Sequence, residues 1–164
     1  MTDHPLRLPE RALSDDEARG ILDEAAYCVV STADEDGAPY GVPLSFVHRD
    51  GRLYVHTARE GHKIADFARD ARVCATAVVD VEACFEDGFM TTRYASAIAR
   101  GRIRRVEDDR EVRHALVALC MKYLPVYKKE IGPAIDRDID EVAVWAIEIE
   151  SLTGKANRRR KQHA

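Results

Sequence analysis

The chain has 164 residues, a net charge of −4, 46% hydrophobic residues and 33% charged residues. This length predicts one domain with a sizeable core, and the negative charge argues against general affinity for nucleic acid. No stretch approaches the roughly 18 apolar residues of a membrane helix, and the N-terminus lacks an apolar signal-peptide core. We therefore expect a cytoplasmic protein with no nucleic-acid or membrane partner.

The N-terminal part of the chain predicts an arm, a helix and a strand. Residues 1–13 contain two prolines and no hydrophobic period, so we expect an extended arm. Ser14 and Glu17 have the spacing of a capping box, and apolar residues at helical spacing follow, which predicts a short amphipathic helix. Residues 27–32 favour a strand, and Asp36-Gly37 favours a turn after it.

Residues 40–57 have the pattern of a β-hairpin. Asp50-Gly51 lies between two alternating apolar runs, which is the strongest short-range sign of a type I′ turn. This turn fixes the register, and the predicted pairs are Arg49–Arg52, Val47–Tyr54, Ser45–His56 and Pro43–Ala58. The other face is the more apolar and is assigned to the core, with Leu44, Phe46, His48, Leu53, Val55 and Thr57. Because Pro43 has no N–H, it must lie at an edge, a bulge or an unpaired position.

A short helix is predicted to begin at Gly61-His62-Lys63. Unpaired backbone N–H groups and a lysine side chain meet at such a helix start, and together they can hold a phosphate group. Lys63 is the candidate cation, and Arg59 is a second one. The alternative is that Lys63 is an ordinary solvated lysine.

The middle of the chain predicts two strands around an irregular segment. Residues 71–80 form a continuous apolar run rich in β-branched residues, which predicts a buried strand. Residues 81–93 lose this pattern and are interpreted as a loop, a candidate border of the active site. Residues 94–106 alternate again, with Ala95, Ala97, Ala99 and Gly101 on a side expected to pack closely.

The C-terminal part predicts a helix, an excursion and a last strand. Asp108 or Asp109 caps a helix with a broad apolar stripe that ends at Leu124-Pro125. Residues 128–140 are charged and contain Gly132-Pro133, so we expect a surface excursion, with a helical turn as an option within it. Residues 142–149 form the last strand, and residues 156–164 are expected to be a basic flexible tail. These elements predict an α+β domain over residues 14–155, built on an antiparallel six-stranded Greek-key-like barrel with flanking helices.

The cysteines and histidines predict neither disulfides nor a metal site. The four cysteines form no C-x-x-C pair and are expected to be reduced and buried. They are Cys28, Cys74, Cys84 and Cys120. His48 and His56 fall on different faces of the predicted hairpin, which argues against a metal pair.

Three stretches of this chain resemble a known family: PYGVPLSFV, GRLYVHTAREGHK and TTRYASAIARGRIRRVED. Together they resemble the flavin-binding split-barrel proteins related to pyridoxamine 5′-phosphate oxidase, and within them the 5-nitroimidazole-resistance (Nim-type) branch. The resemblance runs from Ser14 to Thr153-Gly154-Lys155. It implies a split β-barrel and a homodimer with FMN at the subunit interface. It also implies an oxidoreductase that passes electrons from a reduced donor through FMN to a small acceptor, such as a nitro compound.

The resemblance also assigns the residues of the site. The flavin ring is expected to lie against Val42, Pro43, Leu44, Ser45 and His56, and the phosphate against Thr57, Ala58 and Lys63. Arg93, Tyr94 and Ser96 match a segment that in such dimers approaches the cofactor from the partner subunit, although plain surface or interface roles are equally open to them. His62 matches a histidine beside the flavin, where it could deliver or accept a proton, or act only as a hydrogen-bond donor on the phosphate side.

Three other functions stay open. Oxidation of pyridoxamine or pyridoxine 5′-phosphate requires a further cationic pocket, which the sequence does not identify. A non-catalytic flavin- or haem-binding protein is the second, with His48, His56 or His62 as axial ligands of haem. A reductase that uses the deazaflavin F420 is the third, because proteins with this fold exchange one cofactor for the other.

Overall fold

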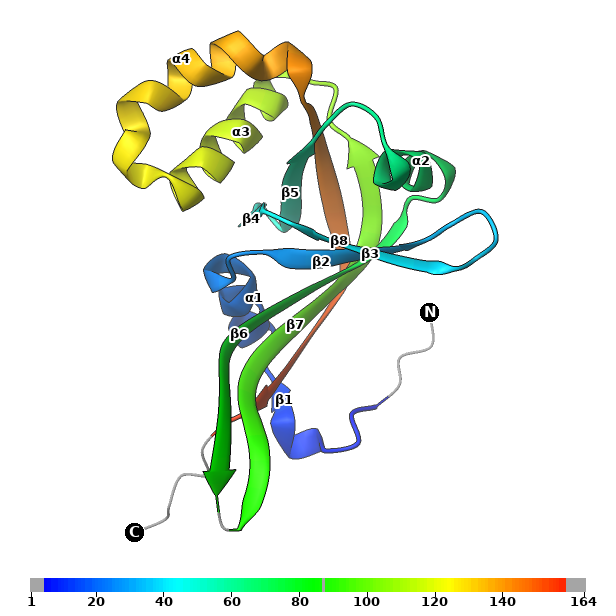
Figure 1. The fold of residues 1–164 in the computed structure, drawn as a ribbon, viewed down its shortest axis with the longest axis vertical. Helices are drawn as coiled ribbons and strands as arrows, with labels where there is room; N and C mark the ends of the chain where they lie inside the picture. Colours follow the sequence, from blue (N-terminus) through cyan, green and yellow to red (C-terminus); the bar gives the residue numbers. More distant parts are fainter. Residues whose placement is uncertain (1–4, 87, 159–164) are drawn as a thin grey trace.

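The computed structural model describes residues 5–86 and 88–158 of the chain, and it is an α+β fold (Figure 1). Its helices are α1 (Asp15–Glu24), α2 (His62–Arg69), α3 (Asp109–Tyr123) and α4 (Lys128–Asp138), with short 3-10 turns η1 (Pro9–Arg11), η2 (Pro125–Tyr127) and η3 (Ile139–Glu141). Its strands are β1 (Ala12–Leu13), β2 (Cys28–Ala33), β3 (Pro39–Leu44), β4 (Phe46–Arg49), β5 (Arg52–Thr57), β6 (Arg72–Glu86), β7 (Phe89–Arg105) and β8 (Ala143–Asn157).

The strands form one antiparallel sheet in the order β3-β2-β6-β7-β8-β5-β4, and β1 pairs with β8. The outermost strands β3 and β4 follow each other in the chain with only Ser45 between them. The chain therefore joins the two edges of the sheet, although no ladder does so among the described residues, and the barrel stays open. The antiparallel α+β class is confirmed, but the predicted number of six strands is wrong. The sheet has eight strands because Ser45 divides one predicted strand and Ala12–Leu13 adds another.

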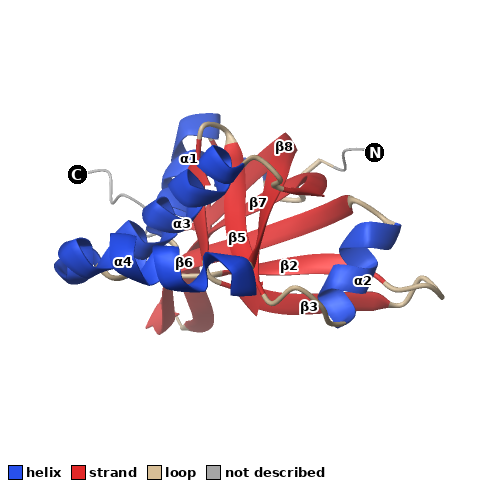
Figure 2. Ribbon diagram, turned by 90° about the horizontal axis from the view of Figure 1, so that it is seen from above, coloured by secondary structure: helices blue, strands red, loops and turns tan. Residues whose placement is uncertain are grey.

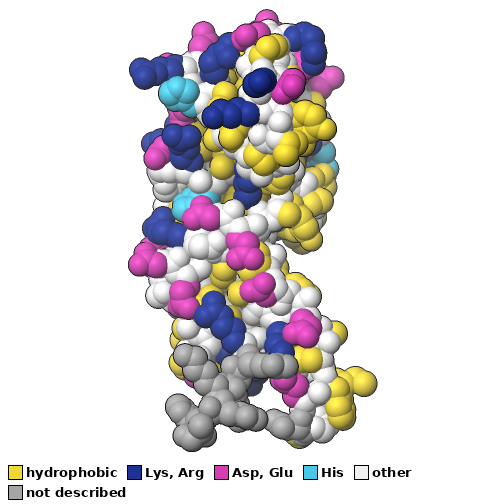
Figure 3. Space-filling view, turned by 90° about the vertical axis from the view of Figure 1, so that its left-hand side faces the viewer, with side chains coloured by type: hydrophobic (Ala, Val, Ile, Leu, Met, Phe, Trp, Pro, Cys, Tyr) yellow, Lys and Arg dark blue, Asp and Glu magenta, His cyan; other side chains and the backbone are white. Residues whose placement is uncertain are grey.

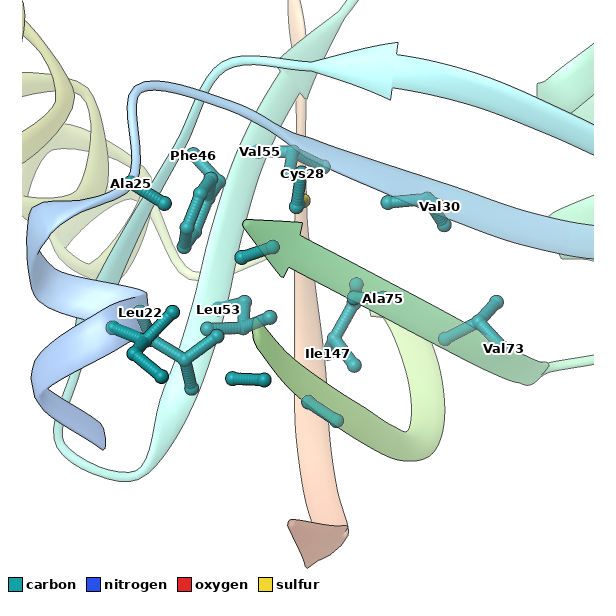
Figure 4. Packing of buried hydrophobic residues seen from close by; sticks show 14 of the residues in the cluster. Leu22, Ala25, Cys28, Val30, Phe46, Leu53, Val55, Val73, Ala75 and Ile147 are labelled. Carbon is teal, nitrogen blue, oxygen red and sulfur yellow. The ribbon is translucent and has the colours of Figure 1, made fainter. Parts of the chain in front are cut away.

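Helix α1 packs against the sheet and completes the main core. Its predicted capping box is confirmed, because Ser14 Oγ accepts from the N–H of Glu17 and the Glu17 carboxylate accepts from the N–H of Ser14. Figure 4 shows Leu22 of α1 beside Phe46 and Leu53 in this core. The small side chains predicted along β7 are fully buried at Ala97 and Ala99, so the layers approach closely. Gly154 of β8 has the same role, because a Cβ there would lie 2.9 Å from the Cβ of Ala18.

The predicted register of the central hairpin is confirmed from Phe46 to Val55, with the Arg49–Arg52 and Val47–Tyr54 pairs as expected. The two outer predicted pairs are wrong. Pro43 pairs instead with Val29 of β2, because the chain leaves β5 at Ser45 and crosses to the other edge of the sheet. Pro43 thus lies on an edge strand, as its missing N–H requires.

The segment predicted as a loop, residues 81–93, belongs instead to a long hairpin of β6 and β7. A bulge between Val79 and Glu82 interrupts the ladder. Beyond it, residues 80–86 and 88–92 form a two-stranded projection that extends past the rest of the sheet (Figure 1). From here on, "the arm" means this projection and not the N-terminal residues 1–13. Phe85 is 71% exposed and Met90 is 90% exposed there. The apolar period is lost in the sequence because both faces of the arm lie outside the core.

The excursion predicted at residues 128–140 is mostly helix α4, which contains Pro133. The helix forms in spite of the proline because Ile131 and Ile135 are buried in a second core with Leu116 of α3 and Tyr54 of β5. Tyr54, expected to point outward, is therefore covered. Strand β8 continues through Asn157, so the predicted start of the tail at residue 156 falls inside a strand. Residues 159–164 of that tail lie outside the described residues.

The helices lie at different ends of the sheet. Figure 2 shows α2 on one side of the strands and α3 and α4 on the other. The predicted start of α2 at Gly61 is confirmed. Of the two caps predicted for α3, Asp108 and Asp109, the structure has Asp108. No helix within residues 5–86 and 88–158 is long and apolar enough to cross a membrane.

Candidate functional site

The start of α2 leaves backbone donors open to a ligand. The N-cap residue Gly61 has φ +127°, a conformation that side-chain-bearing residues rarely adopt. No side chain caps this helix start, so the N–H groups of His62 and Lys63 have no acceptor within the helix. Lys63 is half-buried, and its ammonium group makes no hydrogen bond or ion pair with the described part of the chain. The helix start thus combines free donors with an unneutralised cation.

Strand β3 forms one wall beside this helix start. The ring of Tyr40, on β3, stacks on the ring of His62 with 4.1 Å between the ring centroids. This contact joins an edge strand to the first turn of α2. It places His62 against the same strand that carries Val42, Pro43 and Leu44 farther along.

Asp66 connects α2 to strand β2 of the sheet. Its side chain is only 4% exposed. It accepts a hydrogen bond from Thr32 Oγ1 at 2.8 Å and one from Arg69 at 3.1 Å, and His62 Nε2 lies 3.6 Å away. Burial raises the pKa of Asp66, but the hydrogen bonds from Thr32 and Arg69 and the nearby His62 outweigh burial and bring the pKa below its ordinary value. Asp66 is therefore an ionised anchor that orients His62.

The residues expected around the flavin ring fall into two groups. Pro43 and Ser45 are exposed near the end of β3, whereas Val42 and Leu44 are half-buried. His56 is exposed on the outer face of β5 and lines one cavity together with Ser45. The structure thus brings Ser45 and His56 together even though they do not form a ladder pair.

Thr57 and Ala58 lie at the end of β5, on the way to α2. Thr57 is buried, and its hydroxyl accepts from Trp145 Nε1 at 3.2 Å and donates to the carbonyl of Ala58 at 2.7 Å. The Thr57 hydroxyl is thus occupied within the core, whereas Ala58 is exposed. Arg59, the second candidate cation, donates to the carbonyl of Asp140 at 2.7 Å and is held at η3. Lys63 remains the better candidate for the phosphate.

Arg93, Tyr94 and Ser96 lie on β7 at the base of the arm, far from α2 within one chain (Figure 1). Arg93 forms ion pairs with Glu82, at 3.2 Å, and with Glu86. The ring of Tyr94 lies under the ammonium group of Lys155 at 5.5 Å, and Ser96 Oγ donates to the Lys155 carbonyl. One chain therefore does not bring these three residues to the helix start. Their approach from a partner subunit stays a prediction.

Sequence reasoning missed Tyr40, Asp66 and Thr32. The i, i+4 spacing of His62 and Asp66 was a usable signal, because residues four apart share a helix face. The Thr32–Asp66 and Tyr40–His62 contacts join distant segments and depend on how α2 lies on the sheet. No cluster of three or more histidine, cysteine or acidic residues that could hold a metal occurs in the described ranges.

The fold and the site together define a class of protein, an open antiparallel barrel in which an edge strand contacts an uncapped helix start. Residues 14–156 match the family model described as pyridoxamine 5′-phosphate oxidase. This chain belongs to that family, as its sequence resemblance indicated. No curated protein sequence compared with it gave a significant match.

Solved structures support the same fold. A candidate 5-nitroimidazole antibiotic resistance protein from Bacteroides thetaiotaomicron is 28% identical, with 90% of each chain covered and a TM-score of 0.75. The flavocytochrome Anf3 from Azotobacter vinelandii is 18% identical over 95% of this chain and 73% of its own, with a TM-score of 0.80. An FAD-binding protein from Mesorhizobium loti is 21% identical over 90% of this chain and 98% of its own, with a TM-score of 0.66.

Proposed function

We propose that this protein is an FMN-dependent oxidoreductase that acts as a homodimer and passes electrons from a reduced nicotinamide to a small acceptor such as a nitro compound. FMN supplies a ring that takes up and returns electrons. The observation that carries the proposal is the start of α2, where open N–H groups, a glycine at positive φ and Lys63 meet beside the edge strand β3. The flavocytochrome and FAD-binding neighbours and the family membership support a flavin site.

The residues at the helix start fit a phosphate group. A phosphate dianion is stabilised by backbone N–H groups at a helix N-terminus and by a nearby cation. Lys63 supplies the cation, and a side chain at position 61 would strain the backbone, because Gly61 has φ +127°. The negative charge of Asp66 is compensated by Arg69 at 3.1 Å, so it does not leave an uncompensated anion next to the phosphate. FAD is the second flavin to test, because one of the similar structures is an FAD-binding protein.

His62 is the residue that we propose to move a proton. Its ring is 55% exposed and is held between Tyr40 and Asp66. Because Nε2 faces the Asp66 carboxylate, Nδ1 is the nitrogen left for solvent or substrate. An imidazole nitrogen can both donate and accept a proton, so in this proposal His62 gives or takes a proton at Nδ1 during turnover. In this proposal Tyr40 and Asp66 are positioning residues.

The arm supports the homodimer. A two-stranded ribbon alone in water is only marginally stable, and contiguous exposed apolar side chains mark interaction surfaces. Val81, Phe85, Phe89 and Met90 are all exposed on the arm. A second copy of the chain that covers the arm would stabilise it, and Arg93 and Tyr94 at its base would then approach the partner's cofactor.

Absorption spectra of the purified protein test the cofactor and its turnover. We expect flavin bands that bleach on anaerobic addition of NADH or NADPH and return when a nitro compound is added. Flavin bands that no donor bleaches would indicate a non-catalytic flavin protein. A Soret band would indicate haem, and a colourless protein that binds added F420 would indicate a deazaflavin reductase. Each of these three results contradicts the proposal.

Light scattering of a Phe85→Ser/Met90→Ser variant tests the dimer. The parent is expected to be a dimer, and the variant is expected to dissociate at a protein concentration where the parent does not. Its folding should be preserved, because exposed substitutions change stability by only about 0.5 kcal/mol. A monomeric parent that retains flavin would contradict the homodimer, and an undisturbed variant dimer would exclude the arm from the interface.

A further inference from the structure

A cavity of about 330 Å³ lies on the outer face of β5, beneath α3 and α4. Its walls are mostly aliphatic and include Leu119 of α3, Ile135 of α4 and Val142 just before β8. In Figure 3, which looks onto this side of the molecule, hydrophobic side chains gather over the upper part formed by α3 and α4. Ser45 and His56 supply polar atoms to the cavity from the sheet side.

We propose that this cavity binds an uncharged two-ring aromatic molecule with one hydrogen-bonding oxygen. The place of this ligand next to the cofactor rests on the proposed function, because Ser45 and His56 are also expected beside the flavin ring. The cavity extends from these two residues toward α3 and α4, away from the helix start that is proposed to hold the phosphate.

The size of the cavity sets the number of rings. An apolar cavity of about 150 Å³ stays dry and holds one benzene molecule. The cavity here has roughly twice that volume, which is room for two fused rings. Ser45 and His56 can both donate and accept hydrogen bonds, so they can fix one oxygen of the ligand while the rings contact the aliphatic walls.

The charges around the cavity exclude a phosphate ester. Among the described residues that line it there is no lysine or arginine, and the one acid is Asp138. Both carboxylate oxygens of Asp138 accept from Arg137, at 2.7 and 2.6 Å. A phosphate in this cavity would thus be desolvated without a cation, which is strongly unfavourable. This argues against pyridoxine 5′-phosphate as the occupant.

A pair of probes with the same rings tests the ligand class. 2-Naphthol and 2-naphthyl phosphate are titrated calorimetrically into flavin-free and flavin-loaded protein. We expect 2-naphthol to bind both forms and the phosphate ester to bind at least about tenfold more weakly. Equal binding of the two probes, or no binding of 2-naphthol, would overturn the proposal. If the protein takes up no flavin, the proposed function fails, but the titration of the flavin-free protein still decides what the cavity binds.

A pair of variants tests the location. Ala134→Phe places a ring inside the cavity, whereas Val117→Phe places one on the exposed side of α3 outside it. Ala134→Phe should weaken 2-naphthol binding by roughly tenfold or more and leave flavin affinity unchanged, and Val117→Phe should change neither. Retained 2-naphthol binding by Ala134→Phe would place the ligand elsewhere. Loss of flavin would show that the cavity belongs to the flavin, or to the adenosine part of FAD if only FAD is lost.

Thiol protection in the parent protein gives the same answer without a substitution. Cys120 lines the cavity, whereas Cys74 and Cys84 lie on β6 and serve as references. Burial raises the pKa of Cys28 to about 12, so this thiol stays unreactive. Bound 2-naphthol should slow alkylation of Cys120 by N-ethylmaleimide and leave Cys74 and Cys84 unaffected. Equal rates at Cys120 with and without 2-naphthol would contradict the proposed position.

Discussion

Helices α2 and α3 both follow a strand of the barrel, but they begin in different ways. At the start of α3, the Asp108 side chain accepts from the N–H of Glu111 at 2.7 Å, so the protein satisfies its own donor. At the start of α2, Gly61 offers no side chain, and the ammonium group of Lys63 has no partner among the described residues. A capped start is structural, whereas an uncapped start beside a cation is suited to an anionic ligand.

The two helices also differ in how a carboxylate fixes them to the sheet. Asp66 of α2 is 4% exposed and binds Thr32 of β2. Glu111 of α3 is 26% exposed and accepts from the Tyr54 hydroxyl at 2.9 Å and from Arg104 at 2.9 Å. The anchor of α2 is thus enclosed beneath the candidate site, while the anchor of α3 lies at the rim of a separate apolar core. Disturbing α2 should therefore affect both folding and cofactor, and disturbing α3 mainly folding.

The largest expected effect comes from Phe67→Ala in α2. Phe67 is 3% exposed and its ring centroid lies 5.2 Å from that of Trp145. Removing the ring should lower the free energy of unfolding by about 3–5 kcal/mol and loosen the helix start, so flavin affinity should fall as well. Urea unfolding and flavin titration of the folded variant measure the two effects.

The control for Phe67→Ala is Ile131→Ala in the second core. Ile131 is 7% exposed and lies on α4. Its loss should lower the free energy of unfolding by about 2–5 kcal/mol without changing flavin affinity. Equal losses of flavin affinity in the two variants would show that α2 has no special link to the cofactor.

The next effect is on binding alone. Lys63→Ala should weaken FMN binding by about 1.5–3 kcal/mol, the value of a hydrogen bond to a charged group. Lys128→Ala is the matched control, because Lys128 is an exposed lysine at the start of α4, and it should leave FMN affinity unchanged. Fluorescence titration with FMN measures both. Unchanged affinity in Lys63→Ala would remove this lysine from the phosphate site.

Local patterns in the sequence allowed much of the fold to be predicted. The capping box at Ser14, the turn at Asp50-Gly51 and the starts of α2 and α3 are determined within a few residues, and the structure confirms them. The strand pairing of the residues that precede Phe46 was not predictable, because the change of partner strand at Ser45 depends on the opposite edge of the barrel. Helix α4 was missed because burial of Ile131 and Ile135 outweighs the effect of Pro133.

The candidate site was predictable to the same degree. Gly61, His62 and Lys63 are adjacent in the sequence, and the helix start that they form is present. Tyr40 and Thr32 were missed because their contacts with α2 cross the sheet. The arm was missed because its apolar residues lie on both faces of an exposed ribbon, where no alternation is imposed by a core.

A smaller effect is expected at the capped helix start. Asp108→Ala removes the cap of α3 and should lower the free energy of unfolding by about 1 kcal/mol. Flavin affinity should stay at the parent value, because the start of α3 is occupied by the protein's own side chain. Thermal unfolding and FMN titration test this. A loss of FMN affinity comparable with that of Lys63→Ala would remove the functional distinction between the two helix starts.

The last prediction concerns the two carboxylate anchors, Asp66 and Glu111, and how their contributions to stability depend on pH. Burial raises the pKa of each carboxyl group, but hydrogen bonds and nearby cations outweigh burial. The pKa of Asp66 is therefore below its ordinary value of 3.8, and the pKa of Glu111 is below its ordinary value of 4.5. A carboxyl group with a lowered folded pKa adds stability above its unfolded pKa and loses it as the pH falls through the folded pKa. Asp66→Asn and Glu111→Gln should therefore be less stable than the parent at neutral pH and approach it on acidification.

The difference between parent and variant should be larger for Asp66→Asn, because Asp66 is more enclosed and solvent screens its contacts less. Urea unfolding of the parent and both variants is followed from neutral pH to below the unfolded pKa values of Asp and Glu, which lie at about 4. A pH-independent difference for Asp66→Asn would show that the Asp66 charge does not hold α2. Equal pH dependence in the two variants would mean that the Asp66 charge stabilises its helix no more than the Glu111 charge does.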